Sequence, residues 1–353
     1  MAFLLQRRLD RRNFGRIIIL ALLPVLSGSV GAQVYSITDL GTIGGKNSFA
    51  FAVNALGQVV GSSDDGQGNP HAFLWTSGSG MKDLGTLGGG SSKAFGVNAS
   101  EEVVGWSLTT DKATHAFLWT KGSGMRDLGT LSGGSSYATA INDRGEVVGY
   151  SVDPGSGATH AFIWIESGGM QDLGSLGGPV TRALGINVFG NVVGWSTEGD
   201  VAHAFLWTRG GGMRQLSTPD SAVESQAVGI NASGDVTGWI SKGNENRNAL
   251  VWMEDSGMRS LDSPGAAFDT RATAINALGR IVGTAFATDS GMRAFVWTKS
   301  SGAMFLTDLI PAGSDWTLNV ASAINNMGQI AGYGMIDGQT HAFLLTPMNS
   351  SQK

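Results

Sequence analysis

The sequence predicts an all-β fold, a seven-bladed β-propeller with four strands per blade, and two independent repeat series support this prediction. The first series is the motif HAFLW or a close variant, which begins at His71, His115, His160, His203, Asn248, Arg293 and His341. The second is an asparagine after an apolar pair, at Asn54, Asn98, Asn142, Asn187, Asn231, Asn276 and Asn325. The motif starts are 44, 45, 43, 45, 45 and 48 residues apart. Seven copies of a unit this long indicate a repeat array of propeller blades.

Each copy contains four segments of strand length. In the second copy they are Lys93–Asn98, Glu102–Ser107, His115–Thr120 and Met125–Leu128, which we name strands A, B, C and D in that order. They are rich in Val, Phe, Trp and Ile, are bounded by turn residues, and are too short for stable helices. The A–B connection reads Asn-x-x-Gly in six copies, which suits a tight hairpin, whereas the second copy has Glu101 in the glycine position.

Strand B carries a glycine in every copy. Glycine weakens a strand unless something packs closely over it, so we expect a neighbouring aromatic side chain to cover each one. The glycines are Gly61, Gly105, Gly149, Gly194, Gly238, Gly283 and Gly332.

The order of the segments favours a closed ring over the main alternative, an open β-solenoid. The array begins with a lone D-type strand, Tyr35–Leu40, and ends with a lone C-type strand, His341–Thr346. In a closed ring the first strand completes the last blade and covers both sheet edges. An open array leaves this offset unexplained.

The first 32 residues have the pattern of a signal peptide, which leaves 33–353 as one propeller domain. Five arginines precede an apolar run, Ile17–Leu26, and small residues follow up to Ala32. Residues 10–16 resemble a twin-arginine export motif, and the general secretion route is the alternative. We therefore expect a mature protein that begins near Gln33 and is secreted or periplasmic.

Composition limits the partners. The whole chain has a net charge of −5, and residues 1–32 carry five arginines and one aspartate, so residues 33–353 have a net charge of −9. This balance argues against nucleic acid and anionic membranes as partners. The absence of cysteine excludes disulfides, thiolate metal sites and cysteine nucleophiles.

The texts DLGTLGG and HAFLW together resemble the HAF family of extracellular repeat proteins. The resemblance extends over nearly all of 33–353, is clear in the first four copies, and fades in copies five and six. It implies an extracytoplasmic repeat protein, and it supplies no catalytic residue.

The five histidines all occupy the first position of strand C, so they cannot converge on one metal ion. Aspartate follows histidine by 12 residues in three copies, His71 with Asp83 being the first, and closure of the ring would pair His341 with Asp39. We interpret these pairs as structural hydrogen bonds. His203 has Gln215 in the aspartate position and departs from the rule.

Other chemical signals are weak, and we predict no catalytic residue, metal or cofactor. No serine lies in a G-x-S-x-G elbow, and the glycine-rich GTLGGG text lacks the lysine and helix of a phosphate loop. Aspartates in the B–C loops, Asp64, Asp65, Asp153, Asp200 and Asp337, match no calcium motif, and we interpret them as turn residues.

The D–A loops that enter blades 5 to 7 differ from the Gly/Ser-rich sequences of the D–A loops that enter blades 1 to 4. They carry Asp220, Glu224, Asp262, Asp269, Arg271, Asp315 and Trp316. We predict that ligand contact is carried mainly by Asp262, Asp269, Arg271, Asp315 and Trp316. The predicted function is non-catalytic binding of a protein or glycan. The alternatives are a glycan-directed lyase or hydrolase that uses these carboxylates and, for Trp316, simple packing at the end of blade 7's inner strand.

Overall fold

The computed structural model describes residues 34–218, 223–243, 246–265, 267–287 and 291–348. The predicted signal peptide lies outside the described residues, and so does Asp220. In the part of the chain that the structure describes, no helix is long and apolar enough to cross a membrane.

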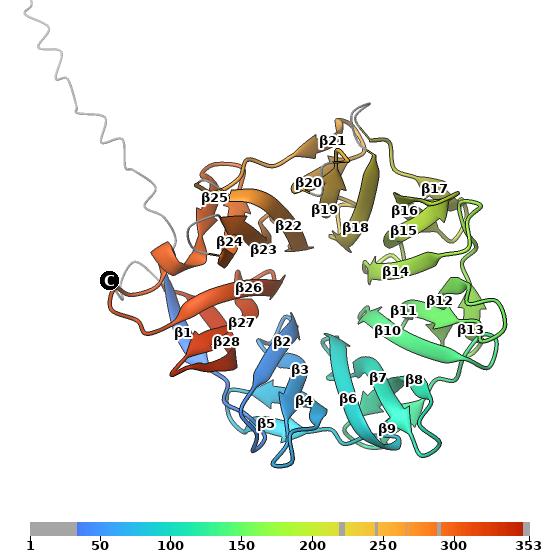
Figure 1. The fold of residues 1–353 in the computed structure, drawn as a ribbon, viewed down its shortest axis with the longest axis horizontal. Coiled ribbons are helices and arrows are strands. Elements are labelled where there is room, and N and C mark those ends of the chain that lie inside the picture. Colours follow the sequence, from blue (N-terminus) through green and yellow to red (C-terminus); the bar gives the residue numbers. More distant parts are fainter. Residues whose placement is uncertain (1–33, 219–222, 244–245, 266, 288–290, 349–353) are drawn as a thin grey trace, which may run out of the picture. The chain divides into compact units, whose positions relative to one another are not determined.

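The described residues from 34 onward form seven antiparallel sheets of four strands, arranged as blades around a central axis (Figure 1). The innermost A strands are β2 (Ser48–Val53), β6 (Gly88–Val97), β10 (Ser135–Ile141), β14 (Thr181–Ile186), β18 (Glu224–Ile230), β22 (Ala267–Ile275) and β26 (Thr317–Ile324). The B strands are β3 (Val59–Asp64), β7 (Val103–Thr109), β11 (Val147–Val152), β15 (Val192–Glu198), β19 (Val236–Ser241), β23 (Ile281–Ala287) and β27 (Ile330–Ile336).

Outside these lie the two outer strands of each blade, in the same order from the first blade to the last. The C strands are β4 (Pro70–Thr76), β8 (Thr114–Thr120), β12 (Thr159–Ile165), β16 (Val201–Thr208), β20 (Arg247–Met253), β24 (Gly291–Thr298) and β28 (Gln339–Pro347). The outermost D strands are β5 (Gly80–Asp83), β9 (Gly124–Asp127), β13 (Gly169–Asp172), β17 (Gly212–Gln215), β21 (Gly257–Ser260), β25 (Gly302–Phe305) and, for the last blade, β1 (Tyr35–Asp39). A short 3₁₀ helix, η1 (Leu306–Leu309), follows β25.

The predicted closure is confirmed. Strand β1 pairs with β28 in a sheet of order β1-β28-β27-β26, with Asp39 opposite Phe343. In Figure 1 the blue β1 therefore lies among the red strands of the last blade. The ring of seven four-stranded blades, closed by its first strand, is the architecture that the repeat count and the offset predict.

The hydrophobic core is divided into seven clusters, one between each pair of neighbouring blades. The cluster between the first two blades, for example, joins Leu74 and Leu84 to Val103, Phe117 and Trp119. Because every blade packs against a neighbour on both faces, the strands carry apolar residues on both sides, and strand C reads as a nearly continuous apolar run. This arrangement explains why the alternation typical of a half-exposed sheet is missing from the repeat.

A ring of asparagines connects the blades at the A–B hairpins. The side-chain amide of each donates to the backbone carbonyl of the asparagine in the next blade, from Asn54 to Asn98 at 2.9 Å and so on around the axis. The last bond, from Asn325 to Asn54, is 2.9 Å long and bridges the two ends of the repeat array. In all seven copies the amide oxygen accepts backbone N–H bonds within its own hairpin, as Asn142 does from Arg144 and Glu146. The second repeat series in the sequence therefore marks a closed hydrogen-bonded ring.

The hairpin without glycine keeps the backbone conformation of the others. Glu101 has φ +62°, and the glycines in its position in the other copies have φ between +69° and +87°. This left-handed region favours glycine because it lacks a Cβ. Glu101 adopts it while its carboxylate accepts a 2.6 Å hydrogen bond from the side chain of Gln58 in the preceding blade.

Candidate functional site

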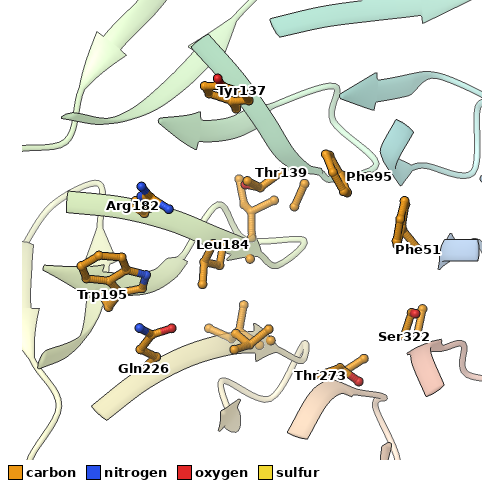
Figure 2. Close-up of a pocket in the computed structure, with 18 of the residues that line it drawn as sticks. Phe51, Phe95, Tyr137, Thr139, Arg182, Leu184, Trp195, Gln226, Thr273 and Ser322 are labelled. Carbon is orange, nitrogen blue, oxygen red and sulfur yellow. The ribbon is translucent and has the colours of Figure 1, made fainter. Parts of the chain in front are cut away.

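The inner strands surround an axial cavity of about 830 Å³. Figure 2 shows labelled side chains of all seven blades around it, among them Phe51, Phe95, Tyr137, Arg182 and Gln226. The volume lies in the range of small-molecule sites in proteins. Toward the asparagine ring the axis narrows to a second space of about 240 Å³.

A β-bulge in every inner strand gives the cavity much of its lining. The register of each A–B pair shifts by one residue, as between Ala138 and Ala140. A bulge places an extra residue in one strand and re-aims its side chain. The seven bulged residues all line the cavity, and they are Phe51, Phe95, Thr139, Leu184, Val228, Thr273 and Ser322.

The bulge also explains the strand B glycines. A Cβ on Gly149 would lie 2.0 Å from the carbonyl oxygen of Tyr137 and 2.9 Å from the ring of Phe162. In all seven copies the nearest atom is such an inner-strand carbonyl, at 1.8 to 2.1 Å, and an aromatic ring is among the three nearest atoms in four of them. The expectation of close packing is therefore correct, but the inner-strand carbonyl is a closer neighbour than the aromatic ring.

Each inner strand has a variable position two residues before the bulged residue. The amino acid there is different in each blade, except that two blades both have arginine. These residues are Phe49, Lys93, Tyr137, Arg182, Gln226, Arg271 and Val320. Each is paired in register with the residue that follows the strand B glycine, as Tyr137 is with Tyr150 and Arg182 with Trp195. The residue after this position is alanine in every blade, and the residue before it is Ser, Thr or, in the last blade, Asn319. Tyr137, Arg182 and Gln226 of the varying set line the axial cavity.

A continuous run of ring contacts forms one wall of the cavity across blades 2 to 4. Trp106 meets Tyr137 edge-on at 6.3 Å, and Tyr137 stacks on Tyr150 at 4.9 Å between ring centroids. The guanidinium of Arg182 then lies 4.6 Å from the ring of Tyr150 and 5.5 Å from that of Trp195. Burial raises the pKa of Tyr150, with Arg182 acting in the opposite direction, which is consistent with a wall of low polarity.

The residues predicted from the divergent loops do not gather in one place. Asp269 and Arg271 lie together on β22, with the carboxylate of Asp269 accepting from Nε at 3.0 Å and from Nη2 at 3.2 Å. Asp262 lies farther out, where its carboxylate accepts from the indole of Trp297 at 2.7 Å and from the backbone N–H of Ala303 at 3.0 Å. Asp262 therefore connects the outer parts of blades 5 and 6.

Asp315 and Trp316 precede β26. Asp315 is exposed, whereas Trp316 is only 7 % exposed and belongs to the core cluster between blades 6 and 7. The indole of Trp316 meets Phe343 edge-on at 5.9 Å. Its position agrees with the packing alternative, and a role in ligand contact stays a prediction for all five residues.

Asp269 and Arg271 line a second pocket, of about 630 Å³, between blades 5 and 6. Glu224 and Arg247 are also in its wall, and Arg247 approaches Asp269 to 4.0 Å. Asp269 is 6 % exposed, so its charge is buried and compensated by two guanidiniums. This pocket holds the two predicted residues that the structure brings together.

The histidines form the predicted pairs. Nδ1 of His115 lies 2.7 Å from the carboxylate of Asp127, and the pairs at His71 and His160 have 2.9 and 3.0 Å. His341 lies 2.9 Å from Asp39 across the closure. His203 meets Gln215 at 3.1 Å, so an amide replaces the carboxylate and the contact is retained. Each pair connects strand C to strand D of the same blade.

Among the B–C loop aspartates, Asp153 and Asp65 stabilise their own turns, whereas the carboxylate of Asp64 accepts from the side-chain amide of Asn47 at 2.8 Å. The carboxylate of Asp153 accepts the backbone N–H groups of Gly155 and Ser156 at 2.8 Å each, and the bond from Ser156 is the main reason its pKa is lowered. Asp65 accepts from Gln67 and Asn69 in the same way. Within the described residues, no three His, Asp or Glu side chains are placed to hold one metal ion.

Comparison with known proteins shows the fold. No protein-family model matches the chain, so the HAF resemblance stays an expectation, and no curated protein matches it. Solved structures do match. The virginiamycin B lyase from Staphylococcus aureus has a TM-score of 0.54 at 12 % identity, over 89 % of this chain and 100 % of that one.

Two further structures are similar. An oligogalacturonate lyase in complex with manganese has a TM-score of 0.58 at 11 % identity, over 92 % of this chain and 96 % of that one. The β-propeller domain of the trilobed protease from Pyrococcus furiosus has a TM-score of 0.56 at 8 % identity, over 91 % of this chain and 100 % of that one. The chain is a seven-bladed β-propeller. At these identities the likeness extends to the fold and not to the chemistry.

Proposed function

We propose that this protein is an exported β-propeller that binds a glycan or protein partner without catalysis, and that the partner enters the axial cavity. The observation that carries the proposal is the composition of the wall. It combines aromatic rings with neutral polar side chains, and the described residues that line it include one arginine and no carboxylate. Aromatic faces and a few polar groups are what binding sites for small ligands present, whereas glycoside hydrolysis uses a pair of carboxylates.

The proposal is tested by the fluorescence of the tryptophans in the wall. Trp106 and Trp195 both line the cavity, so a ligand bound there changes their emission. We expect saturable changes with one class in a panel of oligosaccharides and peptides, and their loss in Tyr137→Ala, which removes the middle of the ring contacts. Mass spectrometry of the bound ligand should recover it unchanged. Turnover of the ligand would contradict the non-catalytic assignment.

A lyase or hydrolase is the second candidate, and one observation favours it. Glu224 and Asp269 line the same pocket between blades 5 and 6, although both oxygens of Asp269 are bound by Arg271. If this pocket acts on a glycan, the parent protein should form cleavage products, and the Glu224→Gln variant should form none. Binding in the axial cavity is expected to be the same in both proteins.

Export is part of the proposal and has its own test. The signal-peptide pattern of residues 1–32 motivates it. N-terminal sequencing of the extracytoplasmic protein is expected to begin near Gln33, and material that retains Ile17–Leu26 would contradict cleavage at that point.

A further inference from the structure

Arg182 is a cation without a counter-ion. No ion pair joins it to a carboxylate in the described part of the chain, and its Nε atom is buried without a hydrogen-bond partner there. By contrast Arg126, which also lies over a tryptophan ring, is paired with Glu166 at 2.9 Å. Arg182 is only partly buried and lines the cavity, so its terminal nitrogens are the donors that a ligand anion can reach. The geometry at Arg182 therefore suits an anionic group of a ligand.

The guanidinium and the rings beside it indicate how such an anion can bind. The ring of Tyr150, from the preceding blade, and the ring of Trp195, from the same blade as Arg182, lie 4.6 and 5.5 Å from the guanidinium. The guanidinium is planar, and the edge formed by its two terminal nitrogens can meet a planar, two-oxygen partner. A carboxylate matches that edge with two parallel hydrogen bonds.

Other polar groups of the wall also lack hydrogen-bond partners within the described part of the chain. The amide of Gln226 and the hydroxyl of Ser322 make no hydrogen bond among the described residues, and both line the cavity. Phe51 and Phe95 face the same space, with their ring centroids 5.1 Å apart. Neutral donors and acceptors between flat apolar surfaces suit a molecule that carries many hydroxyls on rings with apolar faces.

We propose that the axial cavity binds an acidic carbohydrate, a uronate-bearing oligosaccharide, with a carboxylate on the guanidinium of Arg182 and sugar rings against the aromatic wall. The proposal rests on the proposed function, because it places the ligand in the same cavity. It identifies the class of ligand and assigns specificity for the acid to one residue. An acidic peptide shares the carboxylate but lacks the hydroxyl-rich rings that the wall accommodates.

The experiment uses tetrasaccharides of glucuronate, galacturonate, mannuronate and guluronate, each beside its carboxyl-reduced neutral counterpart. Binding to the whole protein is followed by tryptophan fluorescence and calorimetry. At least one uronate should bind more tightly than its neutral counterpart, with an affinity that falls as salt is raised. In Arg182→Gln the affinity for that uronate should fall about ten- to a hundredfold, as expected for a charge-assisted hydrogen bond, and the neutral sugar should be unaffected.

Arg126→Gln is the matched control, because it removes another ring-stacked arginine far out on β9 and should leave uronate binding unchanged. Equal binding of acidic and neutral sugars by the parent would overturn the inference and leave the proposed binding function intact. Binding of a Glu-rich pentapeptide but of no sugar would overturn it as well. If neither sugars nor the peptide bind, both the inference and the proposed site are wrong.

Discussion

The side chain of one asparagine per blade links neighbouring blades near the axis. Asn187 accepts the backbone N–H groups of Phe189 and Asn191 within its hairpin and donates to the carbonyl of Asn231 in the next blade. Asn142 makes the same set of bonds, and Asn231 accepts one hairpin N–H, from Asp235, while donating to the next blade, so the ring side chains serve a turn and an interface at once. This double use explains why asparagine is repeated without exception at this position.

We predict that Asn187→Ala lowers the free energy of unfolding by about 1–3 kcal/mol, because it leaves buried backbone groups without partners. Asn187→Asp keeps the acceptor for the hairpin and loses only the donor to the next blade, so it separates the two contributions. Ser233→Ala, at an exposed hairpin tip, is the control and should have little effect. Urea denaturation measures all three, and an Asn187→Ala protein as stable as the parent would show that the ring is dispensable.

A second prediction at the scale of single residues concerns how stability depends on pH at Asp262. Partial burial acts to raise the pKa of Asp262, but hydrogen bonds from Ala303 and Trp297 more than offset it, so the pKa is lowered. A carboxyl whose native pKa is depressed stabilises the fold above its unfolded-state pKa, near ~3.9, and this stabilisation is lost as pH falls through the native value.

Asp262→Asn should therefore cost about 1 kcal/mol at pH 7, a value reduced by the exposure of the side chain. The difference between variant and parent should shrink as pH falls from 5 toward 3. Asp255→Asn, in an exposed turn of the same blade, serves as the comparison. Thermal melts across this pH range measure the effect, and a difference that grows in acid would have the wrong sign.

At the scale of single elements, the loop into the last blade has a packing role that its sequence conceals. Trp316 stands among charged and small residues, which suggests an exposed indole, yet it lies against Phe343 in the core between blades 6 and 7. Truncation of a buried tryptophan to alanine removes many contacts and leaves a cavity.

We predict that Trp316→Ala lowers the free energy of unfolding by about 3–5 kcal/mol. Phe268→Ala, which removes a 47 % exposed aromatic residue from the start of the preceding inner strand, should cost far less. Calorimetric melting compares the two. If Trp316→Ala instead melts like the parent and loses its ligand, the loop is the binding site that the sequence suggests.

The inner strand is the element where sequence reasoning was least complete. Strand type and order could be predicted because the period, the hairpin Asn-x-x-Gly and the offset of Tyr35–Leu40 are all visible in the text. The bulge could not be predicted, because the pairing register between two strands cannot be read from the sequence of one strand. Without the bulge, the sequence does not show that Thr139 and Ser322 face the axis.

A signal for the cavity was nevertheless present in the repeats. The divergence of the D–A loops led to the prediction of Asp262, Asp315 and Trp316, whereas Tyr137 and Arg182 lie in inner strands, whose bulged positions also differ between copies. The bulged residues, which also vary, all line the cavity, so in this protein variation within the inner strands accompanies the axis, whereas the divergent loops need not face it.

At the scale of the whole molecule, the ring depends on β1 completing a blade made by the other end of the chain. Every other blade joins its C and D strands by a short turn, and the last blade achieves the same pairing without one. The backbone N–H of Met348 donates to the carbonyl of Val34 at 2.8 Å. The end of β28 and the start of β1 are therefore near enough for a short turn to connect them.

Because these two ends are close, we predict that a circular permutant folds in which a different blade, blade 4, is completed by the strand at the N-terminus. The chain would begin at Gly211, run to Met348, continue through a short Gly-Ser turn into Val34, and end at Gly210. Blade 4 would then take its D strand from the new N-terminus, as the last blade now takes β1. Because neighbouring blades present equivalent interfaces, we expect the same fold and a melting temperature within about 5 °C of the parent. Deleting Val34–Gly41 without transferring it should instead leave β28 as the exposed outer edge of its sheet and remove buried Tyr35, worth roughly 1.5–3 kcal/mol by itself. A permutant that fails to fold, or a deletion that melts like the parent, would show that closure by β1 is not what holds the ring together.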